Sequence, residues 1–157
     1  MSTVKDYVGR VVDILAFQDA VVGEEALLSM TLARDGEGGE ITTGIQKLAQ
    51  RFLLEFLTET GSIPYDTGRG TDFMTELRLG RVRTTIEAEQ QFFLATDTAR
   101  LNLTLEETDD MPDDERFGAT TLDSLVIAGD KLTIRMTLRS LAGETREIIL
   151  PLKTTTG

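Results

Sequence analysis

The sequence predicts an α+β fold, with central helices packed on a small antiparallel C-terminal sheet and an extra N-terminal β-hairpin. Apolar residues recur every three to four positions between residues 44 and 101, which is typical of helices. They recur every second position over residues 131–139, which is typical of a strand with one buried face. The chain has 157 residues, enough for one self-sufficient core. We therefore expect one domain at residues 41–157, preceded by a hairpin extension at residues 1–40.

Two short apolar runs, residues 8–17 and 25–33, predict the strands of that extension. They are followed by residues 35–40, which hold three glycines in six positions. Such a stretch is typical of a flexible connection. It marks the boundary between the extension and the domain.

The first helix is predicted over residues 44–59, because its apolar residues fall on one face. These residues are Ile45, Leu48, Ala49, Phe52, Leu53 and Phe56. The opposite face is expected to be polar and consists of Lys47, Gln50, Arg51 and Glu55. Thr43 and Gln46 have the spacing of a capping box. Gly61 ends the helix, an irregular loop follows to Gly70, and further helices are predicted at about 71–78 and 82–101.

Three strands, at about residues 122–128, 131–140 and 145–152, are predicted to form an antiparallel meander. Pro151 lies in the last of them and has no N–H to donate to a ladder, which predicts an edge strand. An edge strand is where an extended segment of a partner can add itself by backbone pairing.

The composition excludes several classes of function. The chain has no Cys and no His, so disulfides, thiolate nucleophiles, zinc fingers and iron–sulfur ligation are excluded, and we expect no cofactor and no metal. Its 16 basic and 27 acidic residues give a net charge of −11, which repels a phosphate backbone and predicts no nucleic-acid partner. With no leader and no run of about 18 apolar residues, we expect no membrane partner and synthesis in the cytoplasm.

Charged clusters give three further candidates. Glu55 and Glu59 lie four residues apart and are either a catalytic carboxylate pair or two solvated residues of a helix face. Residues 106–115 hold seven carboxylates and are either a calcium-binding loop or a solvated acidic loop. The solvated loop is favoured, because the Asp-x-[Asp/Asn]-x-[Asp/Asn]-Gly order of a calcium-binding loop is absent.

The one basic cluster is either a docking surface for an acidic protein patch or a solvated loop. It consists of Arg69, Arg78, Arg81 and Arg83.

The segment from Gly44 to Gly68 resembles the core of the baseplate-wedge family of contractile phage tails, the sheath-initiator subunits that are also labelled tail lysozymes. In that family a helix ends in a Leu-Leu-Thr-x-x-Gly turn, followed by a proline, an acidic residue and a glycine-rich turn. Leu54 to Thr58 and Gly61 fill the first part of the pattern, and Pro64, Asp66 and Gly68 fill the second. A related subunit occurs in type VI secretion baseplates.

The resemblance extends over about residues 42–152. The family carries Glu-Pro-Arg before its terminal strands, and here Asp114-Glu115-Arg116 stands in that place without the proline. The closing strands Leu132–Leu138 and Ile148–Leu152 are similar to the family's terminal sheet. Residues 41–157 are accordingly interpreted as a baseplate-wedge domain.

What the resemblance implies is a non-enzymatic structural subunit of the virion, present in the sixfold tail baseplate and assembled in the host cytoplasm. Its partners would be other wedge proteins, the tail hub and spike, and the sheath protein. Asp114, Glu115 and Arg116 would contact the wedge, and the strand that carries Arg146, Ile148, Leu150 and Leu152 would pair with a sheath arm. The alternative function is a muramidase that uses Glu55 or Glu59.

Overall fold

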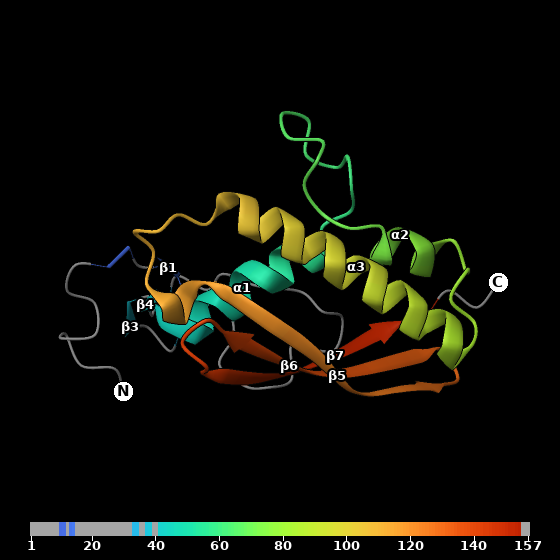
Figure 1. Ribbon diagram of the computed structural model, residues 1–157. Coiled ribbons are helices and arrows are strands. Elements are labelled where there is room, and N and C mark those ends of the chain that lie inside the picture. The colour runs from blue at the N-terminus through green and yellow to red at the C-terminus, as the bar shows by residue number, and fades with distance from the viewer. Residues whose placement is uncertain (1–9, 12, 15–32, 35–36, 39–40, 155–157) are drawn as a thin grey trace.

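The computed structural model describes residues 10–11, 13–14, 33–34, 37–38 and 41–154. It confirms the α+β class (Figure 1). The helices are α1 (Gly44–Leu57), α2 (Phe73–Arg78), α3 (Thr85–Glu106) and the 3-10 turn η2 (Asp113–Glu115). The longer strands are β5 (Phe117–Ala128), β6 (Lys131–Ser140) and β7 (Thr145–Lys153).

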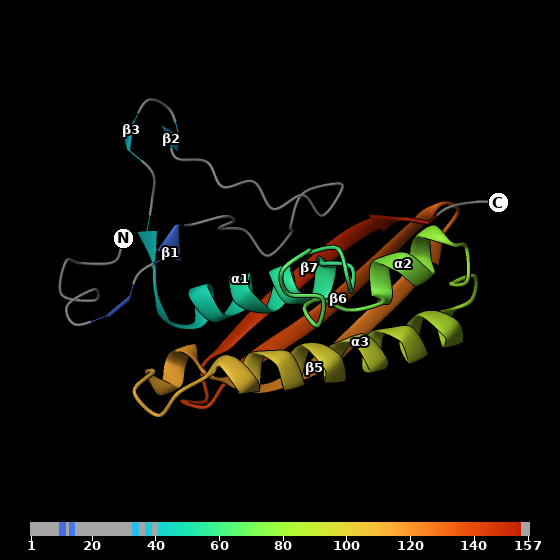
Figure 2. The same cartoon turned by 90° about the horizontal axis from the view of Figure 1, so that it is seen from above.

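The three long strands form an antiparallel sheet in the order β5-β6-β7, which is the predicted meander. Helices α1 and α3 lie side by side over one face of it, as Figures 1 and 2 show from two directions. β5 begins at Phe117, earlier than the predicted start at about residue 122. Phe117 is buried against α1 and belongs to the core. The molecule therefore has a helical layer on a sheet layer.

The core lies between these two layers. Alternate residues of β6 and β7 point into it and are fully or almost fully buried: Leu132, Ile134, Met136, Leu138, Ile148, Leu150 and Leu152. On the helical side Phe56 is central, with its ring centroid 4.8 Å from that of Phe73 and 5.8 Å from those of Phe52 and Phe92. The predicted apolar face of the first helix is thus buried, apart from Ile45, which is half-buried.

Two expectations for α1 were wrong. Thr43 is the N-cap, but its side chain makes no cap hydrogen bond, so the predicted capping box does not form. The predicted polar face is not solvated either, because Lys47, Gln50 and Glu55 are all buried. Both differences arise from side chains that come from distant parts of the chain and contact α1.

The N-terminal prediction falls mostly outside the described residues. Of the predicted strands 8–17 and 25–33, the structure describes β1 (Asp13–Ile14) and the start of β2 (Ala33–Arg34). β1 pairs antiparallel with β4 (Ile41–Thr42), and β2 pairs with β3 (Glu37–Gly38). The glycine-rich stretch 35–40 was predicted as a flexible connection, and its described part, Glu37–Gly38, forms the short strand β3.

Candidate protein-interaction site

Glu115 lies inside the molecule at the first turn of α1. Its side chain is 2% exposed, and its Oε2 is 3.0 Å from Lys47 Nζ. The N–H of Gly44, the first residue of α1, donates to Glu115 Oε1 at 3.1 Å. A carboxylate at this position satisfies a free N–H and is stabilised by the positive end of the helix dipole. Glu115 thereby performs the capping that Thr43 does not.

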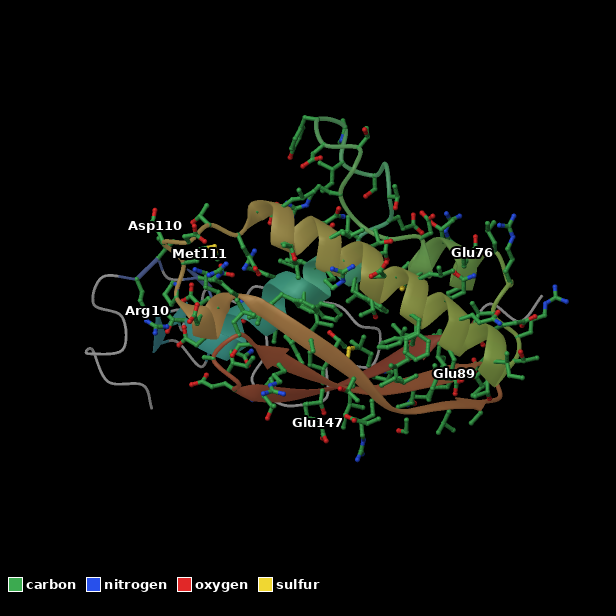
Figure 3. All side chains as sticks on the ribbon, in the orientation of Figure 1. Arg10, Glu76, Glu89, Asp110, Met111 and Glu147 are labelled. Atoms are coloured by element: carbon green, nitrogen blue, oxygen red, sulfur yellow. The ribbon has the colours of Figure 1, made fainter. Side chains whose placement is uncertain are left out.

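Asp114 joins the N-terminal segment to the same place. Arg10 reaches its carboxylate with both terminal nitrogens, at 2.9 and 3.1 Å, and this hydrogen bond holds the pKa of Arg10 above its ordinary value. Lys47 Nζ also donates to the backbone oxygen of Val11 at 2.7 Å. Figure 3 shows Arg10 at the end of the molecule where Asp110 and Met111 lie.

Arg51 is the third cation of this network. Its Nη1 donates to the backbone oxygen of Glu115 at 3.1 Å and lies 3.9 Å from Glu107 Oε1. Burial lowers the pKa of Arg51, although Glu107 and Glu115 favour its charged form. The acidic run 106–115 is only in part the solvated loop that was predicted. Thr108, Asp109, Asp110 and Asp113 are exposed, but α3 extends to Glu106, and the side chains of Glu107 and Glu115 are buried against α1.

Arg116 differs from its two neighbours because it has donor capacity left. Its side chain is 25% exposed, with Nη1 3.5 Å from Asp113 and Nη2 3.8 Å from Asp109. Its Nε is buried and has no hydrogen-bond partner within the described part of the chain. A buried polar atom without a partner is uncommon in native proteins. Of the three predicted contact residues, Arg116 has the most exposed side chain, since that of Asp114 is 20% exposed and that of Glu115 is 2% exposed.

Arg10 and Lys47 complete this cluster, and neither was predicted to contact residues 114–116. Lys47 and Glu115 are 68 residues apart, and Arg10 and Asp114 are 104 apart. Lys47 has the periodicity of a solvated helix face, but Glu115 of η2 and the backbone of Val11 both bind its ammonium group. No local pattern predicts that contact.

The predicted strand 145–152 is β7, which lies at one edge of the sheet that the described residues form. Ile148, Leu150 and Leu152 point into the core, and Arg146 is half-buried. Their side chains are therefore not offered to a partner. What β7 offers at the sheet edge is its backbone.

The hydrogen-bond pattern identifies which backbone groups of β7 face outward. The bonds from Ser140 N to Glu144 O, at 2.9 Å, and from Thr154 N to Asp130 O, at 2.6 Å, lie at the two ends of the β6–β7 ladder. Antiparallel ladders alternate, so the even-numbered residues of β7 bond to β6 and the odd-numbered ones point away from it. The N–H groups of Thr145, Glu147 and Ile149 point outward, and Pro151, which has no N–H, interrupts this series before Lys153.

The opposite edge of the sheet, β5, is less regular. Its register shifts between Phe117 and Ala119 and again between Leu122 and Ser124. Such bulges disrupt a ladder and discourage a further strand from pairing. β7 pairs with β6 without a shift over its whole length.

Glu55 holds the loop between α1 and α2. Its Oε1 accepts hydrogen bonds from Gly70 N at 2.7 Å and from Asn102 Nδ2 at 2.5 Å, and its Oε2 is 2.9 Å from Arg69 Nε. Both carboxylate oxygens are thus engaged by donors of the same chain. Glu59, the other half of the predicted pair, forms an ion pair with Arg78 at 3.2 Å.

The predicted arginine cluster is divided among separate partners. Arg69 bridges Glu55 and Glu106, Arg78 pairs with Glu59, and Arg81 pairs with Glu76 at 2.9 Å. Arg83 Nε donates to the backbone oxygen of Gly80. Within the described residues, no group of three or more acidic side chains is arranged to hold a metal ion.

Comparison of the chain with protein-family models, with curated proteins and with solved structures finds no match. Among the helices of the described residues, none is long and apolar enough to cross a membrane.

Proposed function

We propose that this protein is a structural baseplate-wedge subunit of a contractile phage tail. It links the wedge to the tail hub and initiates the sheath by offering a sheet edge to the first sheath ring. It acts without catalysis, in a sixfold virion assembly that forms in the host cytoplasm, with wedge, hub and sheath proteins as partners.

The observation that carries the proposal is the outer edge of β7. It presents the N–H groups of Thr145, Glu147 and Ile149 at every second position, in a strand whose apolar side chains are anchored in the core. An extended segment that pairs with this edge gains backbone hydrogen bonds without disturbing the core. The regular register of β7 favours this edge over the bulged β5.

The wedge contact is assigned to Arg116. Asp114 and Glu115 already serve the fold, whereas the side chain of Arg116 is 25% exposed and its terminal nitrogens make only long ion pairs, at 3.5 and 3.8 Å. These terminal nitrogens suit a carboxylate of a neighbouring subunit. Glu115 and Asp114 are then positioning residues, because they fix the η2 turn from which Arg116 projects.

The test of sheath initiation is the substitution Ile149→Pro, which removes an outward N–H and no bond to β6. Ile149→Val is the matched control, because it keeps the N–H and the half-buried apolar side chain. Both variants replace the native gene, and sheathed tails are counted in electron micrographs. We expect Ile149→Pro to leave baseplates intact and to lower the number of sheathed tails at least about tenfold, since a ladder is interrupted in its middle.

Each part of the proposal has one outcome that would contradict it. Sheath initiation through β7 would be refuted if the Ile149→Pro protein is folded, as judged by its circular dichroism and thermal midpoint, and sheathed tails still form in normal number. Unchanged baseplate assembly with Arg116→Ala would refute the assigned wedge contact alone. The two variants thus test the two ends of the proposed linkage separately.

A further inference from the structure

The loop between α1 and α2 adds no fully buried side chain to the core. Residues 60–68 are all exposed except Ile63, which is half-buried, and we call these residues the outer loop. Figure 1 shows this loop projecting from the helical layer, away from the sheet. Tyr65 is 93% exposed, the largest fraction among the exposed large apolar residues of the described part of the chain. The outer loop therefore presents an aromatic ring to solvent.

A buried ionic group holds this loop at its base. Glu55 is 2% exposed, and a carboxylate so far from water is costly unless it is fully paired. Two of its partners, Gly70 N and Arg69 Nε, belong to the end of the loop. Its third partner, Asn102 of α3, also donates to the backbone oxygen of Gly68 at 3.3 Å. α1 and α3 thus both fix the position of the loop.

The backbone of the outer loop is folded on itself. Three N–H groups each donate to the carbonyl oxygen three residues earlier, at 3.1 to 3.3 Å: Ser62 to Glu59, Asp66 to Ile63 and Arg69 to Asp66. Pro64 occupies the second position of the middle turn, where its fixed φ is favoured. Compact loops whose ends lie close together frequently carry function. Tyr65 is therefore carried by a loop of defined shape.

This support distinguishes Tyr65 from the other exposed apolar residues. Single exposed apolar residues are normal on a protein surface. Leu101 and Val126, for example, lie in α3 and β5, which also contribute side chains to the core. At Tyr65, by contrast, a buried carboxylate and its partners position a segment that the core does not use. An aromatic side chain that is held in place before binding loses little entropy and is typical of an interface anchor.

The charge of the outer loop indicates the chemistry of the partner. Asp66 is exposed, and no cation of the described residues forms an ion pair with its carboxylate. Arg69, the nearest cation along the chain, is turned toward Glu55 and Glu106 instead. The outer loop thus carries one negative charge and no positive charge.

We propose that the outer loop binds a different protein with a basic surface. Tyr65 is the anchor, with its ring in an apolar pocket of the partner, and Asp66 pairs with a lysine or arginine beside that pocket. A second copy and an anionic lipid surface are both disfavoured, because the chain has a net charge of −11. The inference does not rest on the proposed function.

The first test measures whether Tyr65 is covered in the native complex. The chain has two tyrosines, Tyr7 and Tyr65, and no cysteine, so nitration by tetranitromethane can be followed at each site by mass spectrometry of peptides. The tagged chain is purified with its bound proteins from the cells that make it, and is compared with the isolated chain. We expect Tyr65 to react at least about tenfold more slowly in the complex. Equal rates in the two samples, or recovery of the chain by itself, would overturn the proposal.

The same reagent tests a lipid surface as the alternative partner. The isolated chain is mixed with vesicles of phosphatidylethanolamine and phosphatidylglycerol and separated by flotation. We expect no flotation and an unchanged rate of nitration at Tyr65. Flotation together with protection of Tyr65 would contradict a protein partner.

The second test measures the Kd for the protein that the complex identifies. Tyr65→Ala should raise this Kd at least about tenfold, and Tyr65→Phe should raise it far less because the ring is kept. Asp66→Lys should also raise it, whereas Glu89→Lys should not, although it makes the same change of charge at an exposed position of α3. A folded Tyr65→Ala chain with the wild-type Kd would overturn the anchor. Equal effects of Asp66→Lys and Glu89→Lys would overturn the basic partner.

Discussion

At the scale of single residues, the buried pair of Lys47 and Glu115 is the point on which the N-terminal end of α1 depends. Lys47 is 9% exposed and Glu115 is 2% exposed. Charges so far from water are costly unless each has its partner, and here the two are 3.0 Å apart. The pair therefore fixes η2 against α1 and with it the position of Arg116.

We expect Lys47→Met or Glu115→Leu alone to lower the free energy of unfolding by about 3–5 kcal/mol, because each leaves a buried charge without its partner. The double variant should lose clearly less free energy of unfolding than the two single variants lose together. Urea unfolding of all four proteins gives the coupling energy. The control is the exposed pair of Arg100 and Asp97, whose coupling energy should stay below about 1 kcal/mol. If the losses of unfolding free energy at Lys47 and Glu115 are additive, the two side chains do not stabilise each other and the prediction is wrong.

Glu87 gives a prediction on pH. It closes the capping box of α3, where Thr84 Oγ1 accepts from Glu87 N and the N–H groups of Arg83 and Thr84 donate to Glu87 Oε2. These backbone hydrogen bonds lower the pKa of Glu87. A lowered pKa in the folded state stabilises the protein above the unfolded value, near about 4.3, and this contribution is lost as the pH falls through the folded pKa.

Accordingly, the thermal midpoint of Glu87→Gln should lie below that of the wild type at pH 7. The difference between the two midpoints should narrow as the pH falls below the pKa that Glu87 has in the unfolded chain. Glu89→Gln removes the same charge from the same helix without touching the cap, and should show no such closing gap. Midpoints measured from pH 7 to pH 3 decide the question. A gap for Glu87→Gln that stays constant over this range would contradict the role of the carboxylate as a cap.

At the scale of elements, the loop between α1 and α2 is closed at its base by backbone. Thr71 N donates to Thr58 O at 2.8 Å and Thr60 N to Thr71 O at 3.2 Å, which pairs Glu59 with Thr71. The loop projects from the helical layer in Figure 1. Gly70 makes this closure possible, with φ at 91° and no room for a side chain.

Gly70→Ala should therefore destabilise the protein by about 2 kcal/mol or more, because a Cβ there would lie 2.4 Å from Thr58 O in a backbone conformation that L residues avoid. Gly61→Ala is the matched control. Gly61 also has a positive φ, of 79°, but nothing lies within 4 Å of its added Cβ, so about 1 kcal/mol is expected. If urea unfolding shows that Gly70→Ala and Gly61→Ala lose the same free energy of unfolding, then the contact between the added Cβ and Thr58 O at Gly70 does not destabilise the protein.

The sequence predicted the elements better than their surroundings. The alternation in β6 and the apolar face of α1 are local patterns, and both are confirmed, because burial of one face needs no knowledge of the partner. The polar face of α1 was misplaced, since its partners Glu115, Asp13 and Gly70 come from outside the helix. For the same reason the sequence could name Glu115 but could not place it inside the molecule.

α3 is a second example. Its apolar residues run around the helix, and such a pattern does not say which side is buried. In the structure Phe92, Ala95 and Ala99 lie in the core, whereas Ile86 and Phe93 are exposed. That division is visible only when α3 is packed on α1 and β5.

At the scale of the whole molecule, the two contacts of the proposed function lie at different places on the sheet. The edge of β7 forms one side of the sheet, and Arg116 directly precedes β5, the strand at the opposite side. The net charge of −11 keeps such a chain apart from other acidic molecules and favours neighbours with basic surfaces. The fold is therefore suited to hold two partners at once.

The central claim, that this chain starts a sheath by pairing through β7, is tested most directly by an electron-microscopy map of the intact assembled tail. The proposal predicts six copies around the tail hub, each with an extended segment of a sheath subunit paired along Thr145–Ile149 as a fourth strand. A map in which the chain is absent from the baseplate, or in which β7 has no added strand while the sheath is attached elsewhere, would contradict it.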